Sequence, residues 1–125
     1  AGAQGGGKFL TGGHVRVDGD YGKGFFCEST FVTDLPFEHR LWKHEMFLPI
    51  TTIGKVQNLY QAMGIANDVN YGLTAGFYGN PAETEWFFDN IEAGVTYANR
   101  PQGASTGAWP GFQPFGGWKG SGSSG

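Results

Sequence analysis

The sequence predicts an α/β fold in which parallel strands are joined by crossover helices. Short runs of β-branched and aromatic residues alternate with segments whose apolar residues recur at helical spacing. Strands are expected over residues 8–11, 24–33, 48–56, 73–78 and 95–98, and helices over residues 57–67 and 81–93. Strands and helices that alternate at this spacing indicate parallel strands with right-handed crossovers.

The strands are marked by β-forming residues between turn signals. Residues 24–33 are rich in Phe, Val and Thr, and the run ends where Asp34 and Pro36 begin a turn. Residues 48–56 contain a similar run of Ile, Thr and Val. Both runs therefore predict strands.

The helices are marked by spacing and by the residues at their ends. Apolar side chains recur near helical spacing in residues 57–67, which predicts a short amphipathic helix. The segment 81–93 carries Pro81 in its first turn and Gly94 just past its last, and these are the positions that proline and glycine favour. The second segment is therefore expected to be a helix with defined ends.

Composition and charge limit the classes of protein that fit. With 39% hydrophobic and 16% aromatic residues in a length of 125, the chain can bury a core. A net charge of −3 without any run of Lys and Arg argues against nucleic acid and anionic membrane surfaces as partners. No apolar run approaches the ~20 residues that a membrane-spanning helix needs.

The cysteine and the histidines give no sign of a metal site. Cys27 is the single cysteine, which excludes an internal disulfide and a cysteine-based zinc site and fits the reducing cytoplasm, the expected compartment. Cys27 lies in an apolar run with no cation beside it in the sequence to stabilise a thiolate, so a structural role is expected. The histidines are not spaced as a metal pair on a helix.

Residues 99–125 differ from the rest of the chain, because they are rich in Gly, Pro and aromatic residues without periodicity. The aromatic residues favour an ordered loop, and long loops at the ends of α/β strands usually shape binding sites. The glycine-rich ends of the chain indicate a segment of a larger domain, with flexible linkers as the alternative.

Three stretches, in this order, resemble the aldehyde dehydrogenase family. Residues 45–50 read Glu-Met-Phe-Leu-Pro-Ile and are similar to the family's Glu-x-Phe-Gly-Pro-Val, with Leu48 at the usual glycine. The others are residues 66–76, from Ala-Asn-Asp to Thr-Ala-Gly, and Asn99 followed by Pro-Phe-Gly-Gly-Trp-Lys-Gly-Ser-Gly at 114–122. The resemblance implies that residues 1–125 are part of one catalytic domain, with a strand–helix region at 1–98 and a substrate loop at 99–125.

The same resemblance implies a nicotinamide cofactor, NAD, with NADP possible. Glu45 would bind the nicotinamide ribose, because a carboxylate accepts hydrogen bonds from two hydroxyls, and Phe47 would pack near the ring. The plain alternative is a solvated carboxylate beside a core phenylalanine.

A substrate site is implied in the last segment. In the family the motif phenylalanine lines the aldehyde tunnel, which makes Phe115 a substrate contact, and Asn99 resembles a site-ordering asparagine or a turn cap. The preceding loop resembles that of the glutamate-semialdehyde (1-pyrroline-5-carboxylate) dehydrogenases. The amides of Gly107 and Ala108 would form a nest for the α-carboxylate, unless Gly107 only shapes the loop.

By resemblance, the protein oxidises an aldehyde to an acid by thiohemiacetal formation, hydride transfer and thioester hydrolysis. The cysteine nucleophile and glutamate base of the family precede the first motif, so no catalytic residue is expected in this chain. L-Glutamate γ-semialdehyde, in proline degradation, is the expected substrate, and a homo-oligomer is the expected assembly. The alternatives are a dehydrogenase for another semialdehyde or an aliphatic aldehyde, a noncatalytic binding module, and a pseudoenzyme segment.

Overall fold

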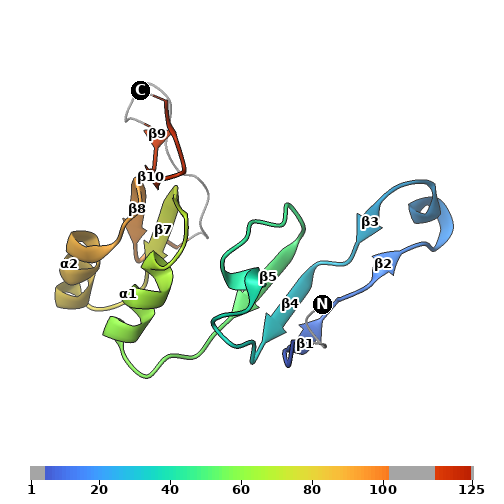
Figure 1. The fold of residues 1–125 in the computed structure, drawn as a ribbon, viewed down its shortest axis with the longest axis horizontal. Coiled ribbons are helices and arrows are strands. Elements are labelled where there is room, and N and C mark those ends of the chain that lie inside the picture. The colour runs from blue at the N-terminus through green and yellow to red at the C-terminus, as the bar shows by residue number, and fades with distance from the viewer. Residues whose placement is uncertain (1–4, 102–114, 125) are drawn as a thin grey trace. The chain divides into compact units, whose positions relative to one another are not determined.

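The computed structural model describes residues 5–101 and 115–124 (Figure 1), and the chain divides into two compact units between Val56 and Gln57. Each unit combines strands with short helices, and each contains one pair of parallel strands. The predicted α/β class is therefore confirmed. Within the described residues, no helix has the length and apolar character needed to cross a membrane, and no group of three His, Cys, Asp or Glu side chains could hold a metal ion.

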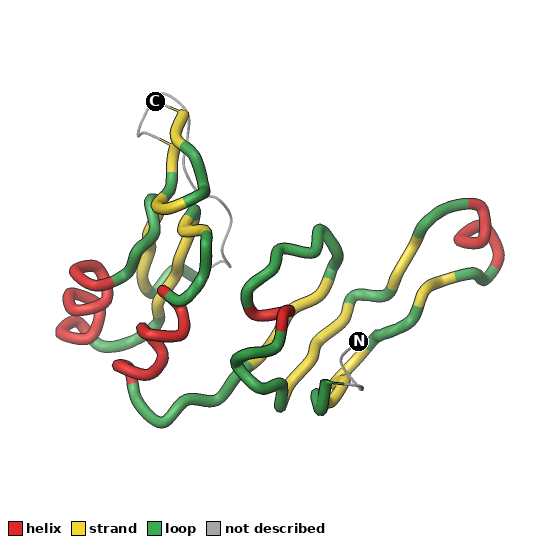
Figure 2. Tube along the Cα trace, viewed as in Figure 1, coloured by secondary structure: helices red, strands yellow, loops and turns green. Residues whose placement is uncertain are grey.

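A three-stranded sheet forms the first unit (Figure 2). The central strand β4, Thr30–Thr33, runs antiparallel to β1, Lys8–Thr11, and parallel to β5, Ile50–Ile53. Alternate residues of a strand point to opposite faces, and accordingly Thr30 and Val32 are buried whereas the residue between them is exposed. The central strand therefore supplies the core of this unit.

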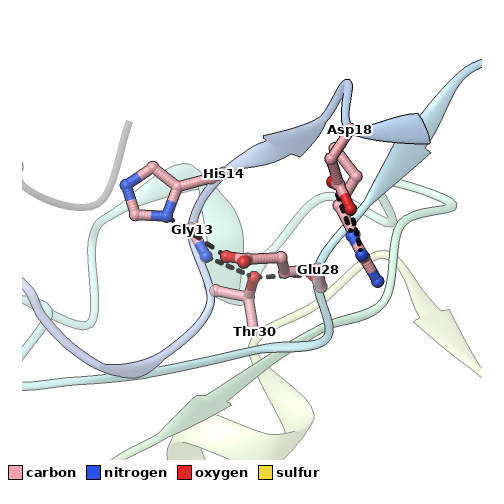
Figure 3. A network of polar contacts seen from close by, with 6 residues as sticks. Gly13, His14, Asp18, Glu28 and Thr30 are labelled. Carbon is pink, nitrogen blue, oxygen red and sulfur yellow. Dashed lines mark hydrogen bonds and ion pairs between the residues drawn. The ribbon is translucent and has the colours of Figure 1, made fainter. Parts of the chain in front are cut away.

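The prediction of one continuous strand at 24–33 is wrong. The segment forms two short strands that pair with different neighbours. β3, Phe26–Cys27, pairs with β2, Val15–Arg16, and the 3₁₀ helix η1, Gly19–Lys23, joins them into an arm. Between β3 and β4 the Thr30 hydroxyl donates to the carbonyl of Glu28 and accepts from the amide of Gly13, both at 2.9 Å (Figure 3). One of these bonds is local and the other joins residues 17 positions apart, and together they fix the bend where the chain passes from the arm into the sheet.

The second unit is built on the parallel strands β7, Thr74–Phe77, and β8, Val95–Ala98. Helix α2, Pro81–Asn90, connects them, and its buried Phe87 stacks on Phe77 with ring centroids 5.1 Å apart. Helix α1, Leu59–Asn67, meets α2 through an edge-to-face contact of Tyr60 and Trp86. The β–α–β order predicted for residues 73–98 is confirmed.

Local side chains fix where both helices begin. Asn58 accepts from the amide of Gln61 at 2.9 Å, so α1 begins at Leu59 rather than at 57. Asn80 and Glu83 form a reciprocal capping box at the start of α2.

The expected end of the second helix at 93 is wrong by one turn. Helix α2 ends at Asn90, because the next residue, Ile91, turns to an extended conformation and is buried at 8% exposure. Burial of an isoleucine side chain stabilises this helix end by about 1.5–3 kcal/mol. That is more than the net stability gained from the hydrogen bond of one further helical residue.

Residues 115–124 form short antiparallel pairs. β9, Phe115–Gly116, pairs with β11, Ser123–Ser124, and β10, Trp118–Lys119, pairs with β6, Tyr71–Gly72. The backbone approach is close at Gly94, where an added Cβ would lie 1.8 Å from the carbonyl oxygen of Gly116. Only a glycine therefore fits at this position.

We predict that Gly94→Ala lowers the thermal unfolding midpoint of the full-length protein that carries these residues. The clash with Gly116 forces a backbone shift, and overpacking of this kind costs about 1–3 kcal/mol. Gly64→Ala is the control, because Gly64 lies inside α1 with open space around it, and this change should stabilise the helix by about 0.5–1 kcal/mol. Equal shifts of the unfolding midpoint for the two variants, measured by differential scanning calorimetry, would show that Gly116 does not restrict position 94.

Candidate cofactor and substrate site

Glu45 and Phe47 lie in the segment that connects β4 to β5. Its first half is ordered by the 3₁₀ helix η2, Arg40–Trp42, whose start is capped by the His39 ring, which accepts from the amide of Leu41 at 3.2 Å. Its second half is tied to the sheet, because the amide of Thr30 donates to the carbonyl of Pro49 at 2.8 Å. The two candidate residues are therefore presented by a segment held at both ends.

A hollow of about 310 Å³ lies beside these residues. Its lining consists of Leu41, His44, Glu45, Met46, Phe47, Leu48 and Ile50. The Phe47 side chain is exposed at 89%, and the Glu45 carboxylate makes no hydrogen bond or ion pair with any residue that the structure describes. A carboxylate without a partner among the described residues and an exposed phenylalanine thus lie beside one hollow, and the exposure of Phe47 argues against the alternative of a core phenylalanine.

Phe47 has a left-handed backbone, with φ at 51°. This conformation costs a residue with a side chain roughly 1–2 kcal/mol, and such strain clusters at ligand sites. Leu48 is not among the described residues with positive φ, so the leucine at the family's glycine position requires no left-handed backbone here. The substitution is therefore accommodated without strain at that residue.

A neighbouring hollow of about 240 Å³ is mainly apolar and includes Cys27 and Glu28 in its lining. Cys27 is half-buried in β3, where it faces Val15 across the strand pair. The ring of His14 contacts the Glu28 carboxylate at 3.1 Å (Figure 3). The strand pairing brings these two side chains together, and their separation in the sequence gives no sign of it.

Two ion pairs lie in the arm formed by β2, η1 and β3, one between Lys23 and Asp20 and the other between Arg16 and Asp18. The Arg16 guanidinium donates to the Asp18 carboxylate at 2.7 Å, and this hydrogen bond lowers the pKa of Asp18 and raises the pKa of Arg16. The Arg16 guanidinium also lies 3.7 Å from the centre of the Tyr21 ring. Both groups are open to solvent, so this pair orders the tip of the arm rather than a site.

Asn99 follows β8 and joins the ends of the two parallel strands. Its side-chain oxygen accepts from the amide of Gly79 at 3.0 Å, and its side-chain nitrogen donates to the carbonyl of Gly79 at 2.9 Å. Its own amide donates to the carbonyl of Phe77 at 2.8 Å, and its φ is 49°, a region that asparagine tolerates well. Asn99 therefore holds the turn between β7 and α2.

The candidate cofactor and substrate residues lie in different parts of the chain, and two of them are not described by the structure. Phe115 is half-buried in β9, in the second unit with Asn99, whereas Glu45 and Phe47 belong to the first. Gly107 and Ala108 lie outside the described residues.

One cluster of contacting residues could not be predicted from any pattern in the sequence. Lys119 contacts Glu92 and Asn67, although Lys119 and Asn67 are 52 positions apart. The pairing of β10 with β6 is what brings them together.

Residues 1–125 match the family model described as "Aldehyde dehydrogenase family". The chain is 39% identical over 117 residues to a 1-pyrroline-5-carboxylate dehydrogenase of Bacillus cytotoxicus, covering 93% of this chain and 21% of that protein. The homologue from Bacillus mycoides, with the same name, is 38% identical over the same length. The chain belongs to the aldehyde dehydrogenase family.

Solved structures agree with this assignment. A 1-pyrroline-5-carboxylate dehydrogenase from Thermus with bound NAD aligns with a TM-score of 0.81 and 33% identity, over 94% of this chain and 22% of that one. Aldehyde dehydrogenase 21 from Physcomitrella patens, in complex with its reaction product succinate, aligns with a TM-score of 0.76 and 29% identity, over 94% and 22%. The chain thus spans about a fifth of the length of the relatives that it matches.

We predict that Asn99→Ala destabilises the full-length protein by about 1 kcal/mol, because it removes two exposed hydrogen bonds and places alanine at a positive φ. Asn99→Gly is the matched variant, since it removes the same hydrogen bonds but tolerates the backbone angle. Thermal unfolding should rank the proteins with asparagine highest, glycine next and alanine lowest. An alanine variant as stable as the parent would mean that the bridge to Gly79 contributes nothing.

Proposed function

We propose that this chain is the part of an NAD-dependent aldehyde dehydrogenase that contacts the nicotinamide half of the cofactor and the aldehyde. The family membership and the name shared by the Bacillus relatives support oxidation of L-glutamate γ-semialdehyde to L-glutamate, a reaction of proline degradation. NAD is favoured over NADP by the Thermus structure, which contains NAD. The family match also favours an enzyme over a noncatalytic binding module.

The observation that carries the proposal is the exposed pair of Glu45 and Phe47 beside one hollow. The residues fit the cofactor, because a carboxylate that has no partner among the described residues can accept two hydrogen bonds from vicinal ribose hydroxyls. Phe47, exposed at 89%, offers an apolar surface for the flat nicotinamide ring, and burial of the Phe47 ring by a ligand would offset the cost of its left-handed backbone. When bound, the nicotinamide supplies the hydride acceptor.

The aldehyde would be held by the second unit. Phe115 would supply an apolar wall, and the amides of Gly107 and Ala108 would hold the α-carboxylate of glutamate semialdehyde. Asn99 would order the site from outside, because it fixes the turn at Gly79 and immediately precedes the segment that carries Gly107. No residue of this chain is assigned the nucleophile or the base.

A second substrate class is favoured by one observation. The Physcomitrella enzyme is in complex with its reaction product succinate, a dicarboxylate. A semialdehyde with a carboxylate at its far end but no α-amino group is therefore the alternative substrate. Such a substrate would use the same proposed amide nest.

We predict that Glu45→Gln raises the KM for NAD of the full-length protein by about tenfold, because a neutral amide loses the charge-assisted hydrogen bonds to the ribose. Fluorescence titration with NADH should show the same weakening without any aldehyde present. Glu38→Gln is the control, since Glu38 is an exposed glutamate of the same segment that does not line the hollow. Unchanged NADH affinity in Glu45→Gln would remove Glu45 from the cofactor site.

We predict that Gly107→Val raises the KM for glutamate semialdehyde by about tenfold or more, because a β-branched side chain disturbs the proposed amide nest. The KM for propanal, an uncharged aldehyde, should change much less. Steady-state kinetics with both aldehydes tests this, and a proportionate rise for both substrates would refute the anchor.

A further inference from the structure

The hairpin of residues 115–124 is held to residues 70–72 of the second unit by main-chain and side-chain hydrogen bonds. The amide of Gly120 donates to the carbonyl of Asn70 at 3.0 Å, and the amide of Gly72 donates to the hydroxyl of Ser121 at 2.7 Å. The amide of Gly117 donates to the carbonyl of Gly122 at 2.9 Å and closes the turn. One side of the hairpin is therefore aligned along β6.

Lys119 adds a charged contact at the same place. Its ammonium contacts the Glu92 carboxylate and the main-chain oxygen of Asn67. The Lys119 side chain is 27% exposed and that of Glu92 38%, so the ion pair is partly shielded from solvent. Lys119 also has a φ of 57°, a strained backbone that the surrounding contacts must stabilise.

Asn67 links this contact to the ends of both helices. Its side-chain oxygen accepts from the amide of Glu92 at 3.0 Å, and its side-chain nitrogen donates to the carbonyl of Asn90 at 2.9 Å. Asn67 is the last residue of α1, where the carbonyl groups carry partial negative charge that favours a cation. The Lys119 ammonium thus lies where a carboxylate and a helix C-terminus both attract it.

The position of Phe115 depends on the same hairpin. Phe115 pairs with Ser124, Lys119 pairs with Tyr71, and only Gly116, Gly117 and Trp118 lie between Phe115 and Lys119. A loss of the Lys119 contact would leave this side of the hairpin held by main-chain bonds and by the hydrogen bond to the Ser121 hydroxyl. Phe115 would then sample a wider range of positions.

We propose that Lys119 is a positioning residue for aldehyde binding, because it anchors the hairpin that carries Phe115 to Glu92 and Asn67. The inference rests on the proposed function for the role of Phe115. It assigns Lys119 no contact with substrate or cofactor.

The test replaces Lys119 in the full-length protein. Lys119→Met removes the charge but keeps much of the side-chain length, and the KM for glutamate semialdehyde should rise by about tenfold with little change in kcat. The NADH affinity should stay unchanged, because Glu45 and Phe47 belong to the other unit. Lys119→Arg should restore most of the aldehyde KM, since it returns a cation to Glu92.

Lys23→Met is the matched control, because Lys23 is a lysine whose ion pair with Asp20 is at the surface. It should leave all kinetic constants unchanged. Glu92→Gln should also raise the aldehyde KM, and the double variant should be no worse than Lys119→Met alone, since Lys119→Met already removes the contact with Glu92. Independent, additive effects would overturn the proposal.

Hydrogen exchange gives a readout that does not depend on activity. The amides of Gly72 and Gly120 should exchange faster in Lys119→Met than in Lys23→Met. Unchanged exchange together with an unchanged aldehyde KM would overturn the proposal. If Lys119→Met does not fold, Glu92→Gln must show the KM rise and the faster exchange, or the proposal fails. If the parent protein shows no aldehyde-dependent reduction of NAD, the proposed function fails, whereas the exchange data still report whether Lys119 anchors the hairpin.

Discussion

Parallel strand pairing is the constraint on which both units depend. The carboxyl ends of two parallel strands lie at one edge of a sheet, so the segments that leave them meet there. In the second unit, this geometry brings Asn99, just after β8, to Gly79, just after β7. In the first unit, the pairing of β4 with β5 leaves the intervening segment, with Glu45 and Phe47, to span the distance between strands. The pairing of strands thus places Asn99 and both ends of the segment that carries Glu45 and Phe47.

The energetic reason for this arrangement lies in the crossovers. In the second unit the crossover is α2, whose Phe87 stacks on Phe77 and buries the apolar face of the strand pair. Burial of one phenylalanine is worth about 1.5–3 kcal/mol, and burial of Ile91 stabilises the helix end at Asn90 in the same way. In the first unit the crossover contains only the short η2. Trp42 of η2 packs against Phe37, with the two ring centroids 5.1 Å apart. A crossover without an α-helix leaves the side chains beyond η2 exposed, and Phe47 is the clearest example.

Strained or glycine-restricted backbone occurs in both units. Phe47, Asn99 and Lys119 all have left-handed φ, and Gly94 is restricted by the carbonyl of Gly116. Asn99 and Lys119 are stabilised by side-chain contacts of their own. Phe47 is different, because its exposed ring has no comparable partner among the described residues. A ligand that covers the ring is the natural complement to that geometry, and this is why the proposal for the cofactor depends on Phe47 as well as Glu45.

The sequence by itself determined the α/β class, the family, the β7–α2–β8 order with its parallel strands, and the start of a helix at Pro81. These features are recorded in residue patterns and motifs that are local in the chain. The tertiary structure alone decided the break between β3 and β4, which depends on Gly13 and Thr30, and the exit at Ile91, which depends on burial. It also decided the contact of Lys119 with Glu92 and Asn67. Residues as far as 52 positions apart meet only when strands pair, and no local pattern records such a pairing.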